Sequence, residues 1–154
     1  MGTGAMESTG DVLARVLADR PDVLVDLVAA HDAVWTALDP ALVEITRLRI
    51  AMLLGNDAEL AARTPGSGVD EATLGELSLW PTSPRYTERD RACLTYLEQH
   101  LIDVANLDDA QAAAVAAHLG DQGLVDYANA VLVLEQRQRL RLAWDRLFAP
   151  QEAR

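Results

Sequence analysis

The sequence predicts an all-α protein of about seven helices. Three observations favour this class: apolar residues recur at helical spacing, no stretch alternates apolar and polar residues for long, and glycine and proline cluster between the periodic segments. Aromatic residues, which favour strands, make up only 5% of the 154 residues. We therefore expect helices packed around one core.

The first half of the chain predicts three helices after a flexible leader over residues 1–10. Met6 is an alternative first residue, which leaves open whether residues 1–5 are native. Asp39 and Pro40 have the form of an N-cap and a first helical residue. The helix that they open runs to about Leu54 and is apolar over more than half of its circumference, so it should be central and buried. The two helices before it are expected over 11–19 and 22–38.

The second half predicts shorter helices divided by clear breaks. Thr64–Gly68 is a breaker rich in glycine and proline, and Gly120 ends one helical segment. Thr87 and Asp108 each begin a capping box, in which the side chain three residues later accepts a hydrogen bond from the N-cap backbone N–H. No linker is long enough to divide residues 11–150, which we expect to form a single domain. The expected helices are 57–63, 70–79, 88–103, 109–119 and 121–148.

Charge and composition exclude several classes of partner. The chain has 13 basic and 24 acidic residues and a net charge of −11, which argues against non-specific binding to nucleic acid or to anionic membranes. No apolar run approaches the ~20 residues of a membrane span, and no signal peptide is evident. The lone cysteine, Cys93, cannot form an intramolecular disulfide, which favours a reducing compartment. A cytoplasmic protein is therefore predicted.

From Ala41 onward, three stretches occur in the order found in a known family. They are a glutamate-bearing helix that ends at Gly55, a Trp…Ser…aromatic…Glu-Arg run over 79–94, and an Asp-rich start at 107–110 before an arginine-bearing last helix. This order resembles the carboxymuconolactone decarboxylase family, and within it the AhpD-like alkylhydroperoxidase branch. The resemblance covers about two-thirds of the chain and implies a homo-oligomer, such as a dimer, trimer or hexamer. The broad apolar girth of the last helix also favours self-association.

The resemblance also shows that the redox centre of the family is lost. Redox-active members carry Cys-x-x-Cys-x-x-x-His after the glycine and a glutamate twelve residues before the first cysteine. Here Glu44 stands at the glutamate position, Asn56 and Glu59 at the cysteine positions, and Arg63 at the histidine position. Neither substitute can act as a thiolate, so peroxidase activity that depends on this motif is expected to be absent.

The substituted positions have a purely structural interpretation. Asn56 can cap a helix with Glu59 at its third position, and Glu59 and Arg63 are spaced to form an ion pair along that helix.

A functional interpretation starts from Glu44. A lone carboxylate on a buried helix is costly without a partner, and Arg63 is available, with Arg47 or Arg49 nearer the surface. A Glu44–Arg63 pair would then lie in the old pocket and take part in ligand binding.

Aromatic and thiol side chains supply further candidates. Trp80, Tyr86 and Trp35 are the aromatic residues most able to line a cavity, and the resemblance makes Trp80 and Tyr86 the expected pocket residues. Cys93 lies in an apolar helical stretch and is interpreted as a small buried hydrophobe. The alternative is a peroxidatic cysteine whose thiol is activated by Arg89, four residues earlier.

The histidines give no sign of a metal site. His31, His100 and His118 lie on three separate predicted helices, without the spacing that metal ligands show. No glycine-rich phosphate loop is present either. We therefore expect neither a metal nor a cofactor.

Two classes of function follow from these residues. The first is a redox-inert protein that binds a small molecule or acts through an oligomeric surface. The second is an enzyme: a one-cysteine peroxidase through Cys93, or a non-redox lyase or decarboxylase. The lyase would use Glu44 as general acid or base and Arg63 to hold a substrate carboxylate. The first class is favoured.

Overall fold

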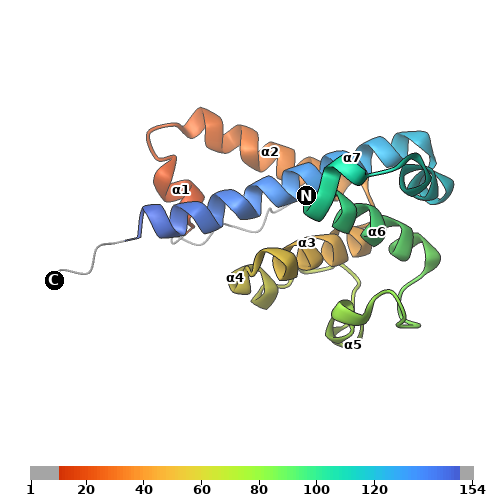
Figure 1. The fold of residues 1–154 in the computed structure, drawn as a ribbon. Coiled ribbons are helices and arrows are strands. Elements are labelled where there is room, and N and C mark those ends of the chain that lie inside the picture. The colour runs from red at the N-terminus through yellow and green to blue at the C-terminus, as the bar shows by residue number, and fades with distance from the viewer. Residues whose placement is uncertain (1–10, 150–154) are drawn as a thin grey trace.

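The computed structural model describes residues 11–149, and these residues form seven α-helices, two short 3-10 helices and no strand (Figure 1). The predicted all-α class is confirmed, and the predicted leader over 1–10 lies outside the described residues. None of the described helices is long and apolar enough to cross a membrane. The elements are α1 (Val12–Val16), α2 (Pro21–Ala37), α3 (Pro40–Leu54), α4 (Asp57–Ala61), α5 (Glu71–Gly75), η1 (Leu77–Leu79), α6 (Glu88–Asp103), η2 (Val104–Asn106) and α7 (Asp109–Leu147).

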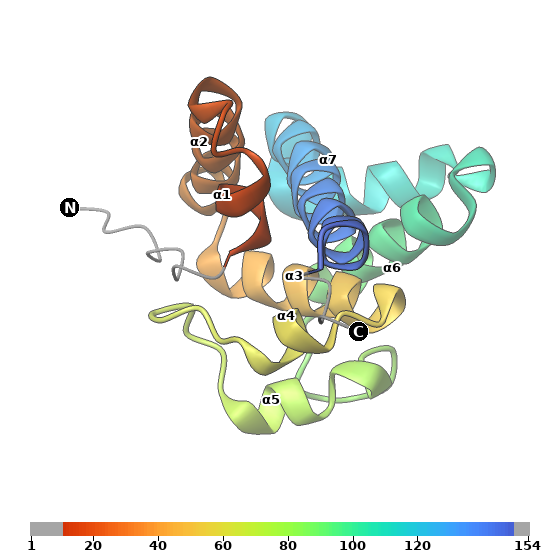
Figure 2. The ribbon, with the colours of Figure 1, turned by 90° about the vertical axis from the view of Figure 1, so that its left-hand side faces the viewer.

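Helix α3 occupies the centre of the molecule, as its apolar girth predicts. It packs against α2, α4, α6 and α7, and it lies between α7 and α5 in Figure 2. The Asp39 side chain caps it by accepting a hydrogen bond from the Ala41 amide, and Pro40 occupies its first turn. Gly55 ends the helix with a left-handed φ of 66°. The central position explains why three of its polar residues, Glu44, Thr46 and Arg47, are buried.

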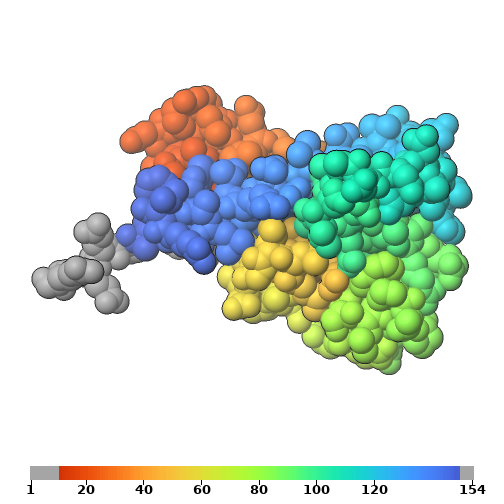
Figure 3. Space-filling view, in the orientation of Figure 1, coloured from red at the N-terminus to blue at the C-terminus, as the bar shows by residue number. Residues whose placement is uncertain are grey.

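Helix α7 consists of a short and a long helical segment that meet at Gly120. This residue has φ 78° and ψ 171°, which is not helical, so the predicted end of one helix at Gly120 is confirmed. Capping boxes form at Asp108 and at Thr87, also as predicted. The long segment that follows Gly120 runs between the α1–α2 pair and the surface formed by α3 and α4 (Figure 3). It therefore joins the two parts of the helical assembly that enclose the candidate site.

Two predicted helices are shorter in the structure. The helix expected over 57–63 ends at Ala61, because Ala62 is already extended ahead of Pro65 and Gly66. The helix expected over 70–79 divides into α5 and the 3-10 helix η1 at Gly75, where glycine weakens helical continuity. The first difference adds residues 62 and 63 to the loop between α4 and α5.

Homo-oligomer formation stays a prediction. Val125 and Leu132 lie seven residues apart on α7, and each is about half exposed. With Leu147 near the end of the helix, they are exposed apolar residues of α7 that self-association could cover.

Replacing Gly120 by alanine should destabilise the protein by about 1–3 kcal/mol, because only glycine adopts its backbone conformation without strain. No atom lies within 4 Å of an added Cβ there, so the loss reports backbone strain rather than a clash. Urea denaturation measures it. The control is Gly75→Ala, also free of neighbours within 4 Å but without a positive φ, which should be neutral or stabilising. Equal stability of Gly120→Ala and wild type would contradict this account.

Candidate functional site

A buried ion pair within α3 forms the base of the candidate site. Arg47 donates from Nε to Glu44 Oε2 at 3.0 Å and from Nη2 to Glu44 Oε1 at 2.9 Å. The Thr64 amide donates to Glu44 Oε1 at 3.1 Å. Only 1% of the Glu44 side chain and 6% of the Arg47 side chain are exposed. A two-point contact of this kind fixes the orientation of both groups.

Arg47 also connects α3 to the segment that contains α4. Its Nη1 donates to Glu59 Oε2 at 2.6 Å and to the Glu59 carbonyl at 3.0 Å, and its Nη2 donates to the Ala62 carbonyl at 2.9 Å. With the two bonds to Glu44, these contacts use all five N–H groups of the guanidinium. Arg47 therefore has no donor left for a ligand.

Both members of the pair stay charged at neutral pH. Burial alone would raise the pKa of Glu44. The hydrogen bonds and charge of Arg47 and the hydrogen bonds from Thr64 outweigh the effect of burial, so the pKa of Glu44 is lowered. Burial alone would lower the pKa of Arg47, yet Glu44 and Glu59 raise it. A carboxylate with a lowered pKa and three hydrogen bonds is poorly suited to general acid or base work.

The predicted Glu44–Arg63 pair is wrong. Arg63 lies beyond the end of α4, and its Nε and Nη2 donate to the exposed Glu71 at 2.8 and 3.2 Å. Arg47 replaces it as the partner of Glu44, because a residue three positions later on the same helix reaches the carboxylate without any loop.

Asn56 and Glu59 take structural roles that match the prediction in part. Asn56 caps α4, with its Oδ1 accepting from the Glu59 amide at 3.3 Å. The predicted Glu59–Arg63 pair is wrong, because the Glu59 carboxylate bridges Arg47 and Arg141, the latter at 3.2 Å. Glu59 thereby links α4 to α7.

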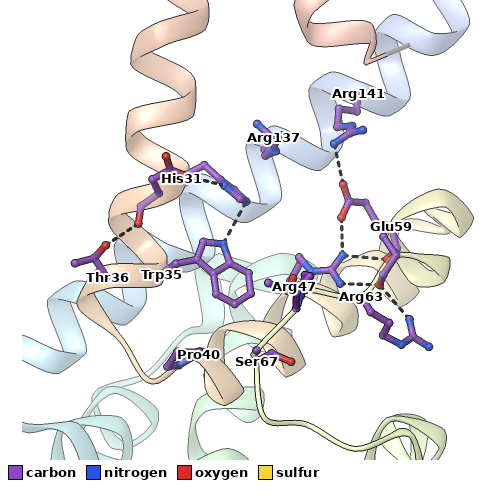
Figure 4. Close-up of a pocket in the computed structure, with 15 residues that line it drawn as sticks. His31, Trp35, Thr36, Pro40, Arg47, Glu59, Arg63, Ser67, Arg137 and Arg141 are labelled. Atoms are coloured by element: carbon purple, nitrogen blue, oxygen red, sulfur yellow. Dashed lines mark hydrogen bonds and ion pairs between the residues drawn. The ribbon is translucent and has the colours of Figure 1, made fainter. Parts of the chain in front are cut away.

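A pocket of about 500 Å³ opens above this network, between α2, α3, α7 and the loop after α4 (Figure 4). The chain has no lysine, and four of its 13 basic residues, all arginines, line this one pocket. The lining residues are His31, Asp32, Trp35, Thr36, Pro40, Arg47, Glu59, Ala62, Arg63, Thr64, Pro65, Gly66, Ser67, Arg137 and Arg141.

His31 and Trp35 form the wall that α2 contributes. Trp35 Nε1 donates to His31 Nε2 at 3.4 Å, so the imidazole proton belongs on Nδ1. Burial, assisted by the charge of Arg137, lowers the pKa of His31 to about 4, and the ring is neutral. Sequence reasoning missed His31, Arg137 and Arg141 as pocket residues. Spacing was the available signal. His31 and Trp35 on α2, like Arg137 and Arg141 on α7, lie four residues apart and so share a helix face.

The structure does not bring Trp80 and Tyr86 to this pocket. Trp80 is buried in the core, where its Nε1 donates to Glu98 at 2.8 Å. Tyr86 lines a separate pocket of about 200 Å³, and its hydroxyl donates to the Thr73 carbonyl at 2.6 Å. Trp35, the third aromatic candidate, is the one that lines the large pocket.

The single thiol lies in the core. Cys93 is fully buried, and burial raises its pKa to about 12 despite the opposing charge of Arg89. At neutral pH it is therefore a thiol rather than a thiolate. Within residues 11–149, no group of three or more His, Cys, Asp or Glu side chains is placed to hold a metal ion.

Comparison with known proteins supports the fold. No protein-family model matches the sequence, and no curated protein matches it. Among solved structures, the chain is similar to a protein of unknown function from Agrobacterium tumefaciens, described as a candidate antioxidant defence protein AhpD. The match has a TM-score of 0.71 and 19% identity, and it covers 90% of this chain and 97% of that chain. The chain therefore has an AhpD-like all-α fold.

Glu44→Gln should lower the free energy of unfolding by about 2–3 kcal/mol, because it removes the buried charge that faces Arg47 while Glu59 remains. Urea denaturation at pH 7 measures the change. The matched control is Glu71→Gln, which removes an exposed partner of Arg63 and should cost less than about 0.5 kcal/mol. Equal effects of the two variants would contradict the assigned role of the buried pair.

The Glu44 contribution should also depend on pH. The folded pKa of Glu44 is lowered from the ordinary value of 4.5, so its stabilisation is present above that value and is lost as pH falls through the folded pKa. The difference in stability between wild type and Glu44→Gln should therefore shrink as the pH falls below about 4.5. Denaturation series at several acidic pH values measure it, and a difference that grows on acidification would contradict the sign.

Cys93 should resist labelling in the folded protein. At pH 8 a thiol-specific reagent should modify native protein at least about a hundredfold more slowly than urea-unfolded protein, because the thiol is buried and its pKa is about 12. Absorbance of the released chromophore measures both rates. Equal rates would show that the thiol is accessible.

Proposed function

We propose that this protein is a redox-inert small-molecule-binding protein on an AhpD-like fold. The observation that carries the proposal is the pocket of about 500 Å³ enclosed by α2, α3, α7 and the loop after α4. Its volume lies in the range of small-ligand sites, and its lining combines an indole ring with polar and charged groups. A cytoplasmic location and self-association are part of the proposal.

The absence of a usable thiol supports the redox-inert part. The two positions that the family resemblance assigns to cysteines hold Asn56, which caps α4, and Glu59, which bridges two arginines. Cys93 is buried elsewhere, in the core. Peroxide reduction by a cysteine needs a thiolate that the peroxide can reach, and Cys93 meets neither requirement.

The geometry of Glu44 favours binding over lyase chemistry. A general acid or base must exchange a proton with a substrate that it touches. Glu44 is fully buried beneath Arg47, accepts three hydrogen bonds and does not line the pocket. Arg63, the proposed holder of a substrate carboxylate, does line the pocket but is engaged with Glu71.

A chemically diverse library of neutral, cationic and anionic fragments should contain compounds that bind the pocket. The ¹⁵N-labelled protein reports binding through the indole N–H signal of Trp35, assigned with Trp35→Phe. The indole of Trp80, bonded to Glu98 in the core, serves as the internal control. Several compounds should shift the Trp35 signal saturably and leave the Trp80 signal in place. A library with no such compound would overturn the proposed function.

Peroxide consumption in the presence of a dithiol reductant should match the rate without protein. Cys93→Ala should give the same rate as wild type, because the wild-type thiol is buried and does not react with peroxide. Peroxide loss is followed colorimetrically over several hours. Turnover in wild type that disappears in Cys93→Ala would show a peroxidase and overturn the redox-inert part.

A further inference from the structure

The pocket gathers arginines in an acidic protein. Its lining side chains include four arginines, with Asp32 and Glu59, while the whole chain carries a net charge of −11. The remaining titratable group of the lining, His31, is neutral because burial lowers its pKa to about 4. Carboxylates outside the lining pair with these arginines, so an anionic ligand is favoured only at an arginine that keeps unused N–H groups.

The arginines differ in their capacity to take a ligand. Arg47 uses all five N–H groups in the buried network, and Arg63 is directed to the exposed Glu71. Arg141 makes one hydrogen bond to the described residues, at 3.2 Å to Glu59, and its contact with Asp11 is 3.7 Å long. Arg141 therefore has N–H groups that a ligand oxyanion can use.

The opposite side of the pocket suits an apolar group. The Trp35 ring lies across the pocket from Arg141, with Pro40 below it (Figure 4). A flat apolar body fits against an indole, while a charged group at the other end reaches the guanidinium.

We infer that the ligand is a small organic acid, whose carboxylate binds Arg141 and whose flat apolar body lies against Trp35. This inference rests on the proposed function and names the class of ligand. A carboxylate fits better than a phosphate for two reasons. A doubly charged phosphate would be repelled by Glu59 and Asp32. In addition, Pro40, the first residue of α3, lines the pocket and has no N–H to donate to a phosphate oxygen.

Glu59 acts as an internal competitor for Arg141. Its Oε1 accepts a hydrogen bond from Arg141 at 3.2 Å, and its Oε2 accepts one from Arg47 at 2.6 Å. A ligand carboxylate must replace the first contact without disturbing the second. Removing the charge of Glu59 should therefore strengthen binding of an acid, whereas loss of a ligand-binding residue would weaken it.

The test compares benzoate with its neutral counterpart benzamide by the Trp35 indole signal of the ¹⁵N-labelled full chain. Benzoate should shift the signal saturably in Glu59→Gln and more weakly in wild type, with at least a threefold difference in Kd. Benzamide should bind both at least tenfold more weakly than benzoate binds Glu59→Gln. In the Glu59→Gln background, Arg141→Gln should weaken benzoate at least tenfold, and Arg141→Lys should recover part of the loss. Arg139→Gln is the matched control, because Arg139 lies on the same helix, pairs with Glu135 and does not line the pocket.

Each alternative outcome has a separate meaning. Equal binding of benzamide and benzoate overturns the anion preference and leaves the proposed function standing. Benzoate that binds neither wild type nor Glu59→Gln overturns the inference, and the proposed function then depends on the fragment library alone. Weaker binding in Glu59→Gln than in wild type overturns the competitor role. Inorganic phosphate that displaces benzoate at equal concentration overturns the preference for a carboxylate with an apolar body. Far-UV circular dichroism and thermal denaturation confirm that each variant is folded, and an effect of Arg139→Gln equal to that of Arg141→Gln overturns the assignment of Arg141.

Discussion

The buried pair of Glu44 and Arg47 is the interaction on which the candidate site depends. It takes two charges out of water on the central helix, which is costly unless every polar atom finds a partner. The guanidinium of Arg47 meets this condition by donating to Glu44, to Glu59 and to the Ala62 carbonyl. The Thr64 amide donates a further hydrogen bond to the Glu44 carboxylate. The pair therefore determines where α4 and the following loop lie.

The pocket follows from this anchoring. Helix α4 has only five residues and buries none of them fully, although Leu60 packs against the core. Ion pairs of Glu59 also hold α4 in position, one with Arg47 of α3 and the other with Arg141 of α7. The ion pairs continue to Asp11 at the start of α1. One line of charges thus joins the consecutive helices α3 and α4 to α1 and α7, which are distant from them in sequence, and a pocket lies between α2 and α7.

Local features of the chain were predictable, and long-range partners were not. The burial of α3 and the break at Gly120 follow from residues within one or two helical turns, where spacing carries the information. The predicted partner of Glu44, Arg63, lies beyond the end of α4 and meets Glu71 instead, a contact eight residues away that no helical spacing contains. The spacing of Arg137 and Arg141 predicts that they share one face of α7, but the approach of that face to α2 is a long-range contact that no local pattern contains. The assignment of Asn56 and Glu59 to the cysteine positions of a redox motif depends on the family resemblance and stays a prediction.

The absence of lysine has a consequence for the behaviour of the protein in alkaline solution. Cys93, the single cysteine, has a pKa of about 12, and the pKa values of the three tyrosines, Tyr86, Tyr96 and Tyr127, are all raised by burial. Arginine keeps its proton throughout this range. Lysine and tyrosines with ordinary pKa values, which take up and release protons in alkaline solution in most proteins, are therefore absent or shifted upward here. The net negative charge of the protein should grow less on alkalinisation than that of a lysine-rich protein.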